Sequence, residues 1–563
     1  MQDLLGRLNI SGFDAEAYIT KNAKNASALP NIAIAFSGGG YRACLNGGGA
    51  VQAFDSREIN STAAGHLGGL LQSATYLAGL SGGGWLVGSI FVNNFTTITA
   101  LLDNNASSVW DFGNSIIEGP ATGSIQVLDS AEYYTGIEHE VSAKGDAGFN
   151  TSVTDYWGRA LSFQLVNASD GGASYTWSSI QLQESFANAD SPMPILVSDG
   201  RAPGETLIPG NTTIYEFNPF EFGTWDPTTY GFVPLEFLGS NFSGGVLADG
   251  EKCVRGFDNV GYVMGTSSSL FNQLILDVNE TSIPQLAKSF VSDILSRFSG
   301  ADNDIAQYQP NPFYGYHKDT SIVYQEPALS LVDGGEDLEN IPLHPLIQPF
   351  RHLDVIFAVD SSADTNNWPN GTSLVATYQR SLNGTSADGG NLANGTSFPA
   401  IPDQNTFVNL GLNTRPTFFG CNSSNTSSPT PLVVYIPNFP YTYQSNVSTF
   451  DLSYNTSQRD LIVENGYNVA TMGNGTANST WPVCVGCAVL QRSLERTQTT
   501  LPQACTQCFA DFCWDGTVNS TNPANYEPTY KINNPGKKSA AIREVASYSI
   551  AAIVATAVLA MVW

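Results

Sequence analysis

A serine between glycines, Ser81 in the stretch Gly79–Gly83, is the residue of this chain best suited to nucleophilic chemistry. The pattern Gly-x-Ser-x-Gly places a serine on a sharp turn from a strand into a helix, where the backbone is strained and the hydroxyl faces a reactant. The apolar run Trp85–Val92 predicts the helix that follows the serine. Residues 70–78, before it, suit a helix end or a short buried strand. An ordinary Gly/Ser turn is the alternative for this pattern taken alone.

A second stretch could supply hydrogen-bond donors to such a serine. Residues 31–36 form a short apolar run typical of a strand, and the glycines Gly38–Gly40 follow it directly. Glycines between a strand and a helix can direct several backbone N–H groups into one anion-binding concavity, which a hydrolytic serine needs for its oxyanion. Phosphate cradling is the alternative, although the chain has no lysine or acidic residue at the spacing that phosphate-binding loops require. Arg42 adds a positive charge beside the glycines, or is a surface or helix-terminal arginine.

An acidic residue at a predicted strand end completes the chemistry. Within the stretch 331–343, an apolar run ends at Asp333, and Gly334 and Gly335 follow. A carboxylate in this place could act as a base, and the glycines would let another backbone approach. A common Asp-Gly turn is the alternative.

Taken together, these stretches resemble one family, the secreted fungal phospholipase B or lysophospholipase family, which shares its catalytic core with the group IV cytosolic phospholipases. The matching motifs are Ser37–Ala43, Gly79–Gly83 and Val332–Gly335, and the tract Phe357–Asp364 is also similar. The resemblance extends from about residue 29 to about residue 515.

The resemblance implies a role for each matching residue. Ser81 is then the nucleophile and Asp333 its partner in a Ser–Asp dyad. Gly39 and Gly40 form the oxyanion hole, and Arg42 faces the substrate phosphate. No metal or other cofactor is expected for this chemistry.

A carboxylate base would suit a chain that has few histidines. Because an unperturbed aspartate has a pKa of about 3.9, it stays ionised in mildly acidic surroundings where histidine is protonated. His344, which follows Asp333 closely, is the best candidate for the alternative Ser-His-Asp triad. The histidines of the chain are His66, His139, His317, His344 and His352.

Composition bounds the classes of partner. The chain has 563 residues, of which 42% are hydrophobic, and its net charge is −27. This acidity argues against nucleic-acid binding and against general electrostatic attraction to anionic membranes. Alternating predicted strands and helices indicate an α/β fold, and the resemblance implies a three-layer α/β/α core with a mainly parallel central sheet, lid or cap insertions and a disulfide-rich C-terminal region.

The chain divides into five predicted segments. Residues 29–480 form the catalytic domain with its insertions, and residues 481–515 form its cysteine-rich C-terminal part. Residues 1–28 lack the apolar core of a signal peptide, so we expect them to be the remnant of a longer N-terminus. Residues 516–540 are a predicted linker, and residues 541–563 are a hydrophobic tail.

Sequons and cysteines indicate the secretory pathway. Twenty Asn-x-Ser/Thr sequons occur, a density that predicts glycosylated surface loops and an oxidising compartment. Cysteines crowd residues 484–513 and predict a disulfide-tied region, with Cys253 and Cys421 as further participants. A zinc ribbon is the alternative for the two Cys-x-x-Cys pairs. We expect Cys44 to be a buried thiol.

The tail predicts a membrane anchor. Small residues 539–541 precede an apolar end that is short for a spanning helix, an order typical of a GPI-attachment signal. Gly536 is another candidate attachment residue, and a tail-anchored helix is the alternative. We therefore expect a protein attached to the plasma membrane or cell wall.

The predicted function is a lysophospholipase of the phospholipase B type, which hydrolyses acyl esters of lysophospholipids and phospholipids and releases fatty acid. A catalytically silent GPI-anchored wall glycoprotein and a Ser-His-Asp esterase of another fold are the alternatives.

Overall fold

The computed structural model of the chain describes residues 1–103, 108–116, 118, 119, 130–203, 205, 207–269, 305–383, 391–422 and 430–532. Residues Met1–Lys531 form one compact unit, which does not include Ile532–Trp563. The predicted GPI signal and its attachment residues lie outside the described residues. Within the described part of the chain, no helix is both long and apolar enough to cross a membrane.

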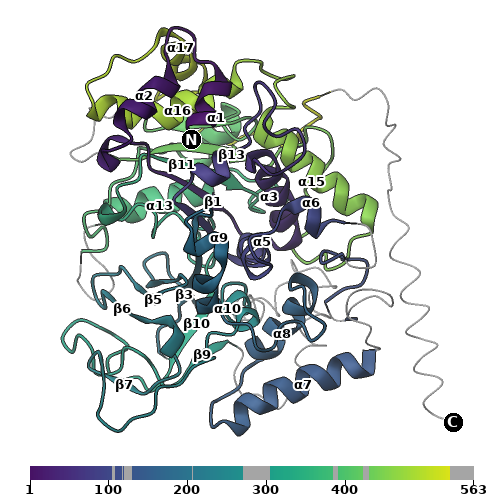
Figure 1. Cartoon of the computed structure of the whole chain (residues 1–563), viewed down its shortest axis with the longest axis vertical. Coiled ribbons are helices and arrows are strands. Elements are labelled where there is room, and N and C mark those ends of the chain that lie inside the picture. The colour runs from purple at the N-terminus through teal and green to yellow at the C-terminus, as the bar shows by residue number, and fades with distance from the viewer. Residues whose placement is uncertain are drawn as a thin grey trace, which may run out of the picture. The chain divides into compact units, whose positions relative to one another are not determined.

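The first unit is built on an 11-stranded sheet, seen near the middle of Figure 1. Its strands run in the order β12-β13-β11-β1-β2-β3-β4-β5-β6, while β10 pairs with β3 and β9 pairs with β10. The strands of this sheet are β1 (Ile32–Phe36), β2 (Tyr76–Gly79), β3 (Met193–Gly200), β4 (Ile214–Phe217), β5 (Glu221–Thr224), β6 (Gly231–Pro234), β9 (Ala306–Tyr308), β10 (Leu329–Asp333), β11 (Val355–Asp360), β12 (Thr417–Phe419) and β13 (Leu432–Pro437). The hairpin β7 (Phe242–Ser243) and β8 (Val246–Leu247) is separate from it.

Helices flank the sheet (Figure 1). They are α1 (Gln2–Leu8), α2 (Ala15–Asn22), α3 (Gly40–Phe54), α4 (Leu70–Ser73), α5 (Ser81–Val92), α6 (Ile98–Leu101), α7 (Ser130–Asp146), α8 (Val153–Leu165), α9 (Glu184–Ala187), α10 (Val260–Thr266), α13 (Thr372–Leu382), α14 (Gln404–Asn409), α15 (Thr456–Thr471), α16 (Trp481–Arg496) and α17 (Gln503–Phe512).

The centre of the sheet is parallel and its edges are antiparallel. Strands β13, β11, β1, β2 and β3 are joined by parallel ladders, whereas β12 and β4–β6 pair antiparallel at the two ends. Every residue of β1, β11 and β13 is buried, because helices cover both faces of a parallel sheet. This confirms the predicted α/β class and adds the antiparallel edges, which the sequence analysis did not foresee.

The two faces of the sheet pack against different helices. Ala33 and Ala35 of β1 face a core that α13 and α14 complete with Leu374 and Phe407. On the opposite face, Phe36 lies against α3, which packs in turn against α5 and α15. Figure 1 shows α3, α5 and α15 together on one side of the strands and α13 on the other. Together, these layers confirm the predicted three-layer arrangement.

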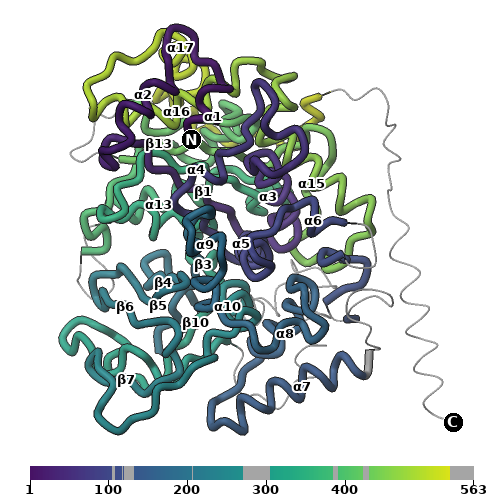
Figure 2. The backbone as a smooth tube through the Cα atoms, viewed as in Figure 1, coloured from purple at the N-terminus to yellow at the C-terminus, as the bar shows by residue number. Residues whose placement is uncertain are grey.

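The N-terminal helices join the C-terminal ones at one end of the unit, where Figure 2 shows purple and yellow-green backbone together. The Tyr18 hydroxyl of α2 lies 2.7 Å from the Ser493 hydroxyl of α16, and Ser493 donates to Ala28 O at 2.5 Å. These contacts bind residues near the two ends of the compact unit to each other.

Three disulfides tie the C-terminal region, as predicted. Cys484 pairs with Cys508 and Cys487 with Cys505, so both bonds join α16 to α17. The zinc-ribbon alternative is therefore wrong, because all four thiols of the two Cys-x-x-Cys pairs are oxidised.

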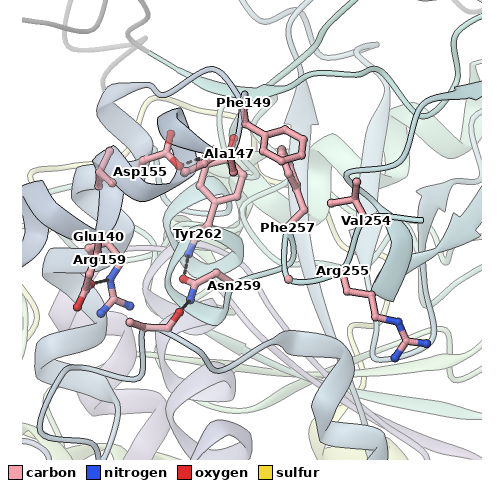
Figure 3. A pocket seen from close by; sticks show the side chains of 14 residues that line it. Glu140, Ala147, Phe149, Asp155, Arg159, Val254, Arg255, Phe257, Asn259 and Tyr262 are labelled. Atoms are coloured by element: carbon pink, nitrogen blue, oxygen red, sulfur yellow. Dashed lines mark hydrogen bonds and ion pairs between the residues drawn. The ribbon is translucent and has the colours of Figure 1, made fainter. Parts of the chain in front are cut away.

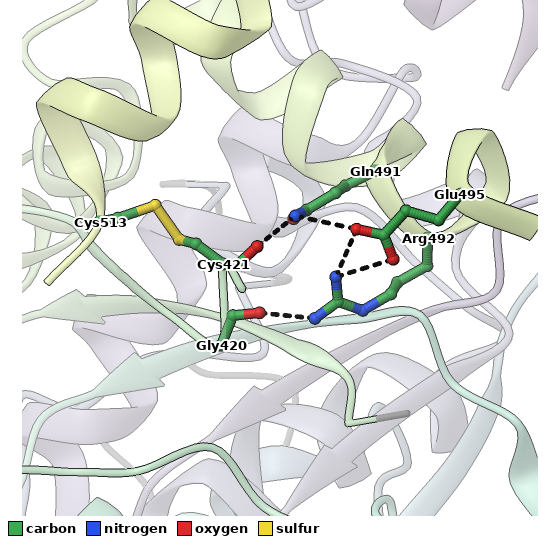
Figure 4. The surroundings of a disulfide bond; sticks show 6 residues. All are labelled: Gly420, Cys421, Gln491, Arg492, Glu495 and Cys513. Atoms are coloured by element: carbon green, nitrogen blue, oxygen red, sulfur yellow. Dashed lines mark hydrogen bonds and ion pairs between the residues drawn. A yellow bond between two sulfur atoms is a disulfide. The ribbon is translucent and has the colours of Figure 1, made fainter. Parts of the chain in front are cut away.

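A third disulfide, Cys421–Cys513, joins the end of β12 to the residue after α17. Figure 4 shows its surroundings, where Arg492 donates to Gly420 O and Gln491 donates to Cys421 O.

The other two cysteines are unpaired. Cys44 is a buried thiol in α3, as predicted, whereas Cys253 is exposed and free, so its predicted part in a disulfide is wrong for the described residues.

Candidate active site

The predicted strand–turn–helix around Ser81 is present. Strand β2 ends at Gly79, and α5 begins at Ser81, whose φ is +49°. Since a non-glycine residue rarely adopts positive φ, this serine is held in a strained conformation. A Cβ atom at Gly82 would clash with the backbone of Gly40, and one at Gly79 would clash with Gly83. The glycines around Ser81 are therefore required by close backbone packing.

Two strands that run toward each other bring Asp333 to Ser81. Strand β2 runs parallel to β3 and pairs Gly79 with Leu196. Strand β10 runs antiparallel to β3 and pairs Asp333 with Ser198. Both strands lie along β3, and their C-terminal ends meet two β3 residues apart. The chain turns away at Ser81 on one side and after Asp333 on the other, which leaves the two side chains facing each other.

The Asp333 carboxyl is buried and poised to accept a proton. Its Oδ1 accepts a hydrogen bond from the Gly335 N–H at 2.9 Å, and the Ser81 hydroxyl interacts with the carboxylate. Oδ2 has no partner with good hydrogen-bond geometry among the described residues, so the contact with Ser81 is a loose one. Burial raises the pKa of Asp333 to about 6, although Ser81 and Gly335 oppose this shift by hydrogen bonding.

The glycine loop lies directly beside the serine. Gly39 and Gly40 have φ values of +133° and +60°, and α3 begins at Gly40. A Cβ atom at Gly38 would lie 3.0 Å from Ser81 Cβ, which shows how closely the loop approaches. The Gly38 N–H donates to Asn340 O at 3.0 Å, whereas the N–H groups of Gly39 and Gly40 have no acceptor within the described ranges. Two donors beside the serine are thus free for an anion.

Arg42 lies beneath this loop and is fully buried. Its Nε donates to Ser361 O at 2.8 Å, Nη1 to Val447 O at 2.7 Å and Nη2 to Thr449 Oγ1 at 3.1 Å. Burial lowers the pKa of Arg42 to about 10, so the guanidinium still carries its charge at neutral pH. In this structure Arg42 holds neighbouring backbone, and its predicted contact with a substrate phosphate stays a prediction.

Two residues to which the sequence analysis gave no role connect the parts of the site. Ser267, just after α10, accepts the Ser81 N–H at 2.9 Å with its backbone oxygen, and the Gly334 N–H lies 3.4 Å from the same atom. Asn340 binds Gly38 through its backbone oxygen and donates from Nδ2 to Ser362 Oγ at 2.7 Å. Asn340 lay inside the Asp333 tract of the sequence, but only the fold reveals its contact with Gly38.

The tract 357–364, noted in the sequence, supports the glycine loop. Strand β11 ends at Asp360, and the next N–H group, that of Ser361, donates to Ser37 Oγ at 2.6 Å. Ser362 donates from both its N–H and its hydroxyl to Asp360 Oδ1, at 2.9 and 2.6 Å. This tract therefore fixes the position from which Ser37 starts the glycine loop.

The histidines lie apart from the serine. His344 is buried and lies 3.3 Å from Gln348 Nε2 through its own Nε2, and no hydrogen bond joins it to Ser81 or Asp333 in the described chain. Burial lowers the pKa of His344 well below its usual value, with nearby arginines adding to the effect. The geometry gives no support to the Ser-His-Asp alternative.

Aromatic residues between positions 157 and 225 lie in different parts of the fold. Trp157 lies against Trp85 of α5 and donates to Ser268 Oγ at 3.1 Å, so it borders the serine segment. Phe217 and Phe222 instead pack with each other inside the sheet core. Trp177 is buried, Phe220 is exposed, and Trp225 stacks on Phe350.

A cavity of about 240 Å³ lies elsewhere, between α7, α8 and α10 (Figure 3). Its lining contains none of the residues described above around Ser81, and two ion pairs lie within it: Arg159 with Glu140 and Lys144 with Asp155, both at 2.5 Å. Lys144 also lies 3.8 Å from the ring centre of Tyr262. This cavity is therefore separate from the serine site.

The described residues contain no group of three or more histidine, cysteine or acidic side chains arranged to hold a metal ion.

Comparisons with known proteins agree with this geometry. A family model described as the lysophospholipase catalytic domain matches residues 32–519. Lysophospholipase 1 of Aspergillus fumigatus is 63% identical over 94% of this chain and 83% of its own length. The lysophospholipase of Penicillium chrysogenum is 58% identical over 99% of this chain and 91% of its own length.

Among solved structures, human GIVD cytosolic phospholipase A2 is similar, with a TM-score of 0.61 over 88% of this chain and 67% of that chain. At 16% identity this likeness concerns the fold alone. Family model and relatives together cover nearly the whole described unit, and the chain belongs to the lysophospholipase family.

Proposed function

We propose that this protein hydrolyses the acyl ester bonds of lysophospholipids, and of diacyl phospholipids, with Ser81 as nucleophile and Asp333 as its base. The observation that carries the proposal is the meeting of a strained serine with a buried carboxylate at the converging ends of β2 and β10. The names of the relatives, which are lysophospholipases, support the substrate class.

The proposed reaction proceeds through an acyl-enzyme. Asp333 accepts the proton of the Ser81 hydroxyl while Ser81 Oγ attacks the ester carbonyl. The N–H groups of Gly39 and Gly40 stabilise the oxyanion. When the intermediate collapses, the ester C–O bond breaks, the glycerol oxygen leaves with the proton from Asp333, and the acyl chain remains on Ser81. Water, activated by Asp333, then releases the fatty acid and restores the serine.

A single carboxylate can serve as this base because its environment raises its pKa. An aspartate at its ordinary pKa of about 3.9 is a weak proton acceptor, and burial brings Asp333 to about 6. A base performs best when its pKa lies near the working pH, so the buried site improves Asp333 for this role.

The silent wall glycoprotein is the second candidate. It would require neither the strained conformation of Ser81 nor two free N–H groups beside it. Both features carry an energetic cost, which argues for a working site.

We also propose that the protein is secreted and attached to the cell surface by a GPI group that replaces its C-terminal tail. Disulfides support passage through an oxidising compartment. Sequon residues at the protein surface support it too: Asn94 is exposed, and Asn211, Asn370 and Asn478 are partly exposed.

Fatty-acid release from lysophosphatidylcholine tests the dyad. Ser81→Ala should lower kcat by about 10⁴-fold or more, because no nucleophile remains. Asp333→Asn should cause a comparable loss, because the amide keeps the shape but cannot accept the serine proton. Ser73→Ala is a matched control, since the Ser73 hydroxyl has no hydrogen-bond partner in the described structure.

His344→Ala completes this series and should retain most activity once folded. A folded but inactive His344 variant together with an active Asp333→Asn variant would replace the dyad with a triad.

The pH profile of kcat/KM should show an acid limb near pH 6. Below its pKa of about 6, Asp333 is protonated and cannot act as base, so activity should fall tenfold per pH unit as pH decreases. Asn340→Asp should move this limb to higher pH, because Asn340 Oδ1 and Asp333 Oδ1 both lie next to Gly335 and a new carboxylate there would raise the pKa of Asp333. An unmoved limb in this variant would argue against Asp333 as the titrating group.

Gly39→Ala should displace the glycine loop and lower kcat by about 10²–10³-fold, the loss typical when one oxyanion donor no longer reaches the substrate. The new Cβ atom would lie 2.6 Å from Arg42 Nη2 and 2.7 Å from Ser361 O, at a φ of +133° that alanine does not tolerate. Gly136→Ala in α7 is the control, because a Cβ atom there meets nothing within 4 Å. Wild-type kcat in a folded Gly39 variant would place the oxyanion hole elsewhere.

Arg42→Lys should weaken turnover of lysophosphatidylcholine more than turnover of a small neutral ester such as p-nitrophenyl butyrate. Lysine keeps the charge but loses the forked geometry that suits a phosphate. Arg255→Lys, at a largely exposed arginine, is the control and should change neither rate. Equal losses on both substrates would assign Arg42 to holding the backbone of residues 361 and 447 and the Thr449 hydroxyl alone.

A further inference from the structure

A buried arginine faces three carboxylates beside the turn that follows Asp333. Arg380 of α13 has its Nη2 3.1 Å from Asp337 Oδ2 and its Nε hydrogen-bonded to Glu339. Asp199 of β3 accepts the Asp337 N–H with Oδ2 at 3.0 Å. These four residues, which we call the Arg380 cluster, are all buried.

The Arg380 cluster is connected to Asp333 through both the sheet and the chain. Asp199 pairs with Val332 across the β3–β10 ladder, one position from the pair of Ser198 and Asp333. Asp337 belongs to residues 334–340, the turn directly after Asp333, and its Oδ1 accepts the Glu339 N–H at 2.7 Å. The cluster therefore holds the turn by its side chains and its backbone.

The same turn ends at the residue that holds the glycine loop. Asn340 follows Glu339, and its backbone oxygen accepts the Gly38 N–H at 3.0 Å. A displacement of the turn would thus move Asp333 and the predicted oxyanion donors together.

The charges of the cluster do not balance. One guanidinium faces three carboxyl groups, and Asp199 Oδ1 and Glu339 Oε2 have no hydrogen-bond partner among the described residues. Burial, with Asp337 beside it, raises the pKa of Asp199 well above its ordinary value. Burial and Glu339 raise the pKa of Asp337 to about 7. Buried carboxylates that share one cation keep a proton, because a second unpaired charge is costly to bury.

The other charged groups near the cluster do not supply the missing cation. Glu336 also faces Asp199 and adds negative charge. His344 lies near Arg380 and Arg351, and burial holds its pKa well below the usual value, so its ring is neutral. Arg351 pairs with Glu216 at 2.6 Å.

We propose that Arg380 is a positioning residue for Asp333, and that with Asp199, Asp337 and Glu339 it fixes the turn 334–340 most firmly while Asp199 and Asp337 share a proton. This rests on the proposed role of Asp333 as base. Arg380 touches neither Ser81 nor Asp333, and it acts through the turn. The cluster makes the active site most rigid in mildly acidic solution.

The sign of the pH effect follows from the raised pKa values. A carboxyl group whose pKa is higher in the folded than in the unfolded protein contributes its full stability below the unfolded pKa of about 4. This contribution is lost as pH rises from about 4 through the folded value, which is about 7 for Asp337. Above that window the ionised Asp337 adds negative charge to the cluster.

The first test measures thermal stability against pH with no substrate present. The melting temperature of the wild-type protein should fall between pH 5 and pH 8, and Asp199→Asn should reduce this fall, because asparagine mimics the protonated acid permanently. Asp319→Asn, at an exposed aspartate, is the matched control and should keep the wild-type fall. An equal fall in Asp199→Asn and in the wild type would overturn the proposal. Because this measurement needs no catalysis, it stays valid if the dyad itself is wrong.

The second test measures turnover of lysophosphatidylcholine. Arg380→Lys keeps the charge and loses the fork that joins Asp337 to Glu339, so kcat should fall by about 10–100-fold with KM nearly unchanged, as expected when a catalytic group is displaced. The cluster should also make wild-type kcat decline at alkaline pH, and this decline should begin at a higher pH in Asp199→Asn. Wild-type kcat in a folded Arg380→Lys variant across pH 5–8 would overturn the positioning role. If Asp333→Asn remains active while these pH shifts occur, the base is misassigned and the cluster stands.

Discussion

The candidate active site depends on two strands that approach each other end to end along one side of β3. A strand normally pairs with one neighbour along each of its edges. On one edge of β3, however, β2 pairs with the first part of the strand and β10 with the last part. Neither strand can continue, since the other blocks it. The chain therefore turns sharply where each strand ends, and Ser81 has its strained conformation at one of these two turns. The Ser81 and Asp333 side chains are brought together by strand pairing, which is far more rigid than a contact between loops.

Backbone hydrogen bonds then connect the two turns with the glycine loop. Ser267 binds the Ser81 turn and contacts the turn after Asp333, while Asn340 binds that second turn to Gly38. Each link uses a buried backbone N–H that would be costly to leave unpaired. By contrast, the N–H groups of Gly39 and Gly40 lack an acceptor in the described structure. The site thus satisfies the donors that hold it and leaves free the donors that would meet a substrate.

Local patterns in the sequence predicted the local elements of this site well. The apolar run before Gly38, the Gly-x-Ser-x-Gly turn and the strand ending at Asp333 are all present, because each is determined by residues next to one another. Residues 70–78 contain both alternatives, the helix α4 and the strand β2. Contacts across the chain were missed: Ser267 lies 186 residues from Ser81. Cys253 was assigned a disulfide because composition indicates oxidation but cannot indicate which thiols meet.

The C-terminal disulfides are nested: Cys487–Cys505 lies inside Cys484–Cys508, and both lie inside Cys421–Cys513. No bond crosses another, so the two inner ones can close as soon as α16 and α17 form a helical hairpin, before any strand is in place. The outer bond then fastens that hairpin to the edge strand β12. A single peptide cleavage between Cys421 and Cys513 would leave both fragments joined, so nicked and intact chains would differ in electrophoresis only after reduction.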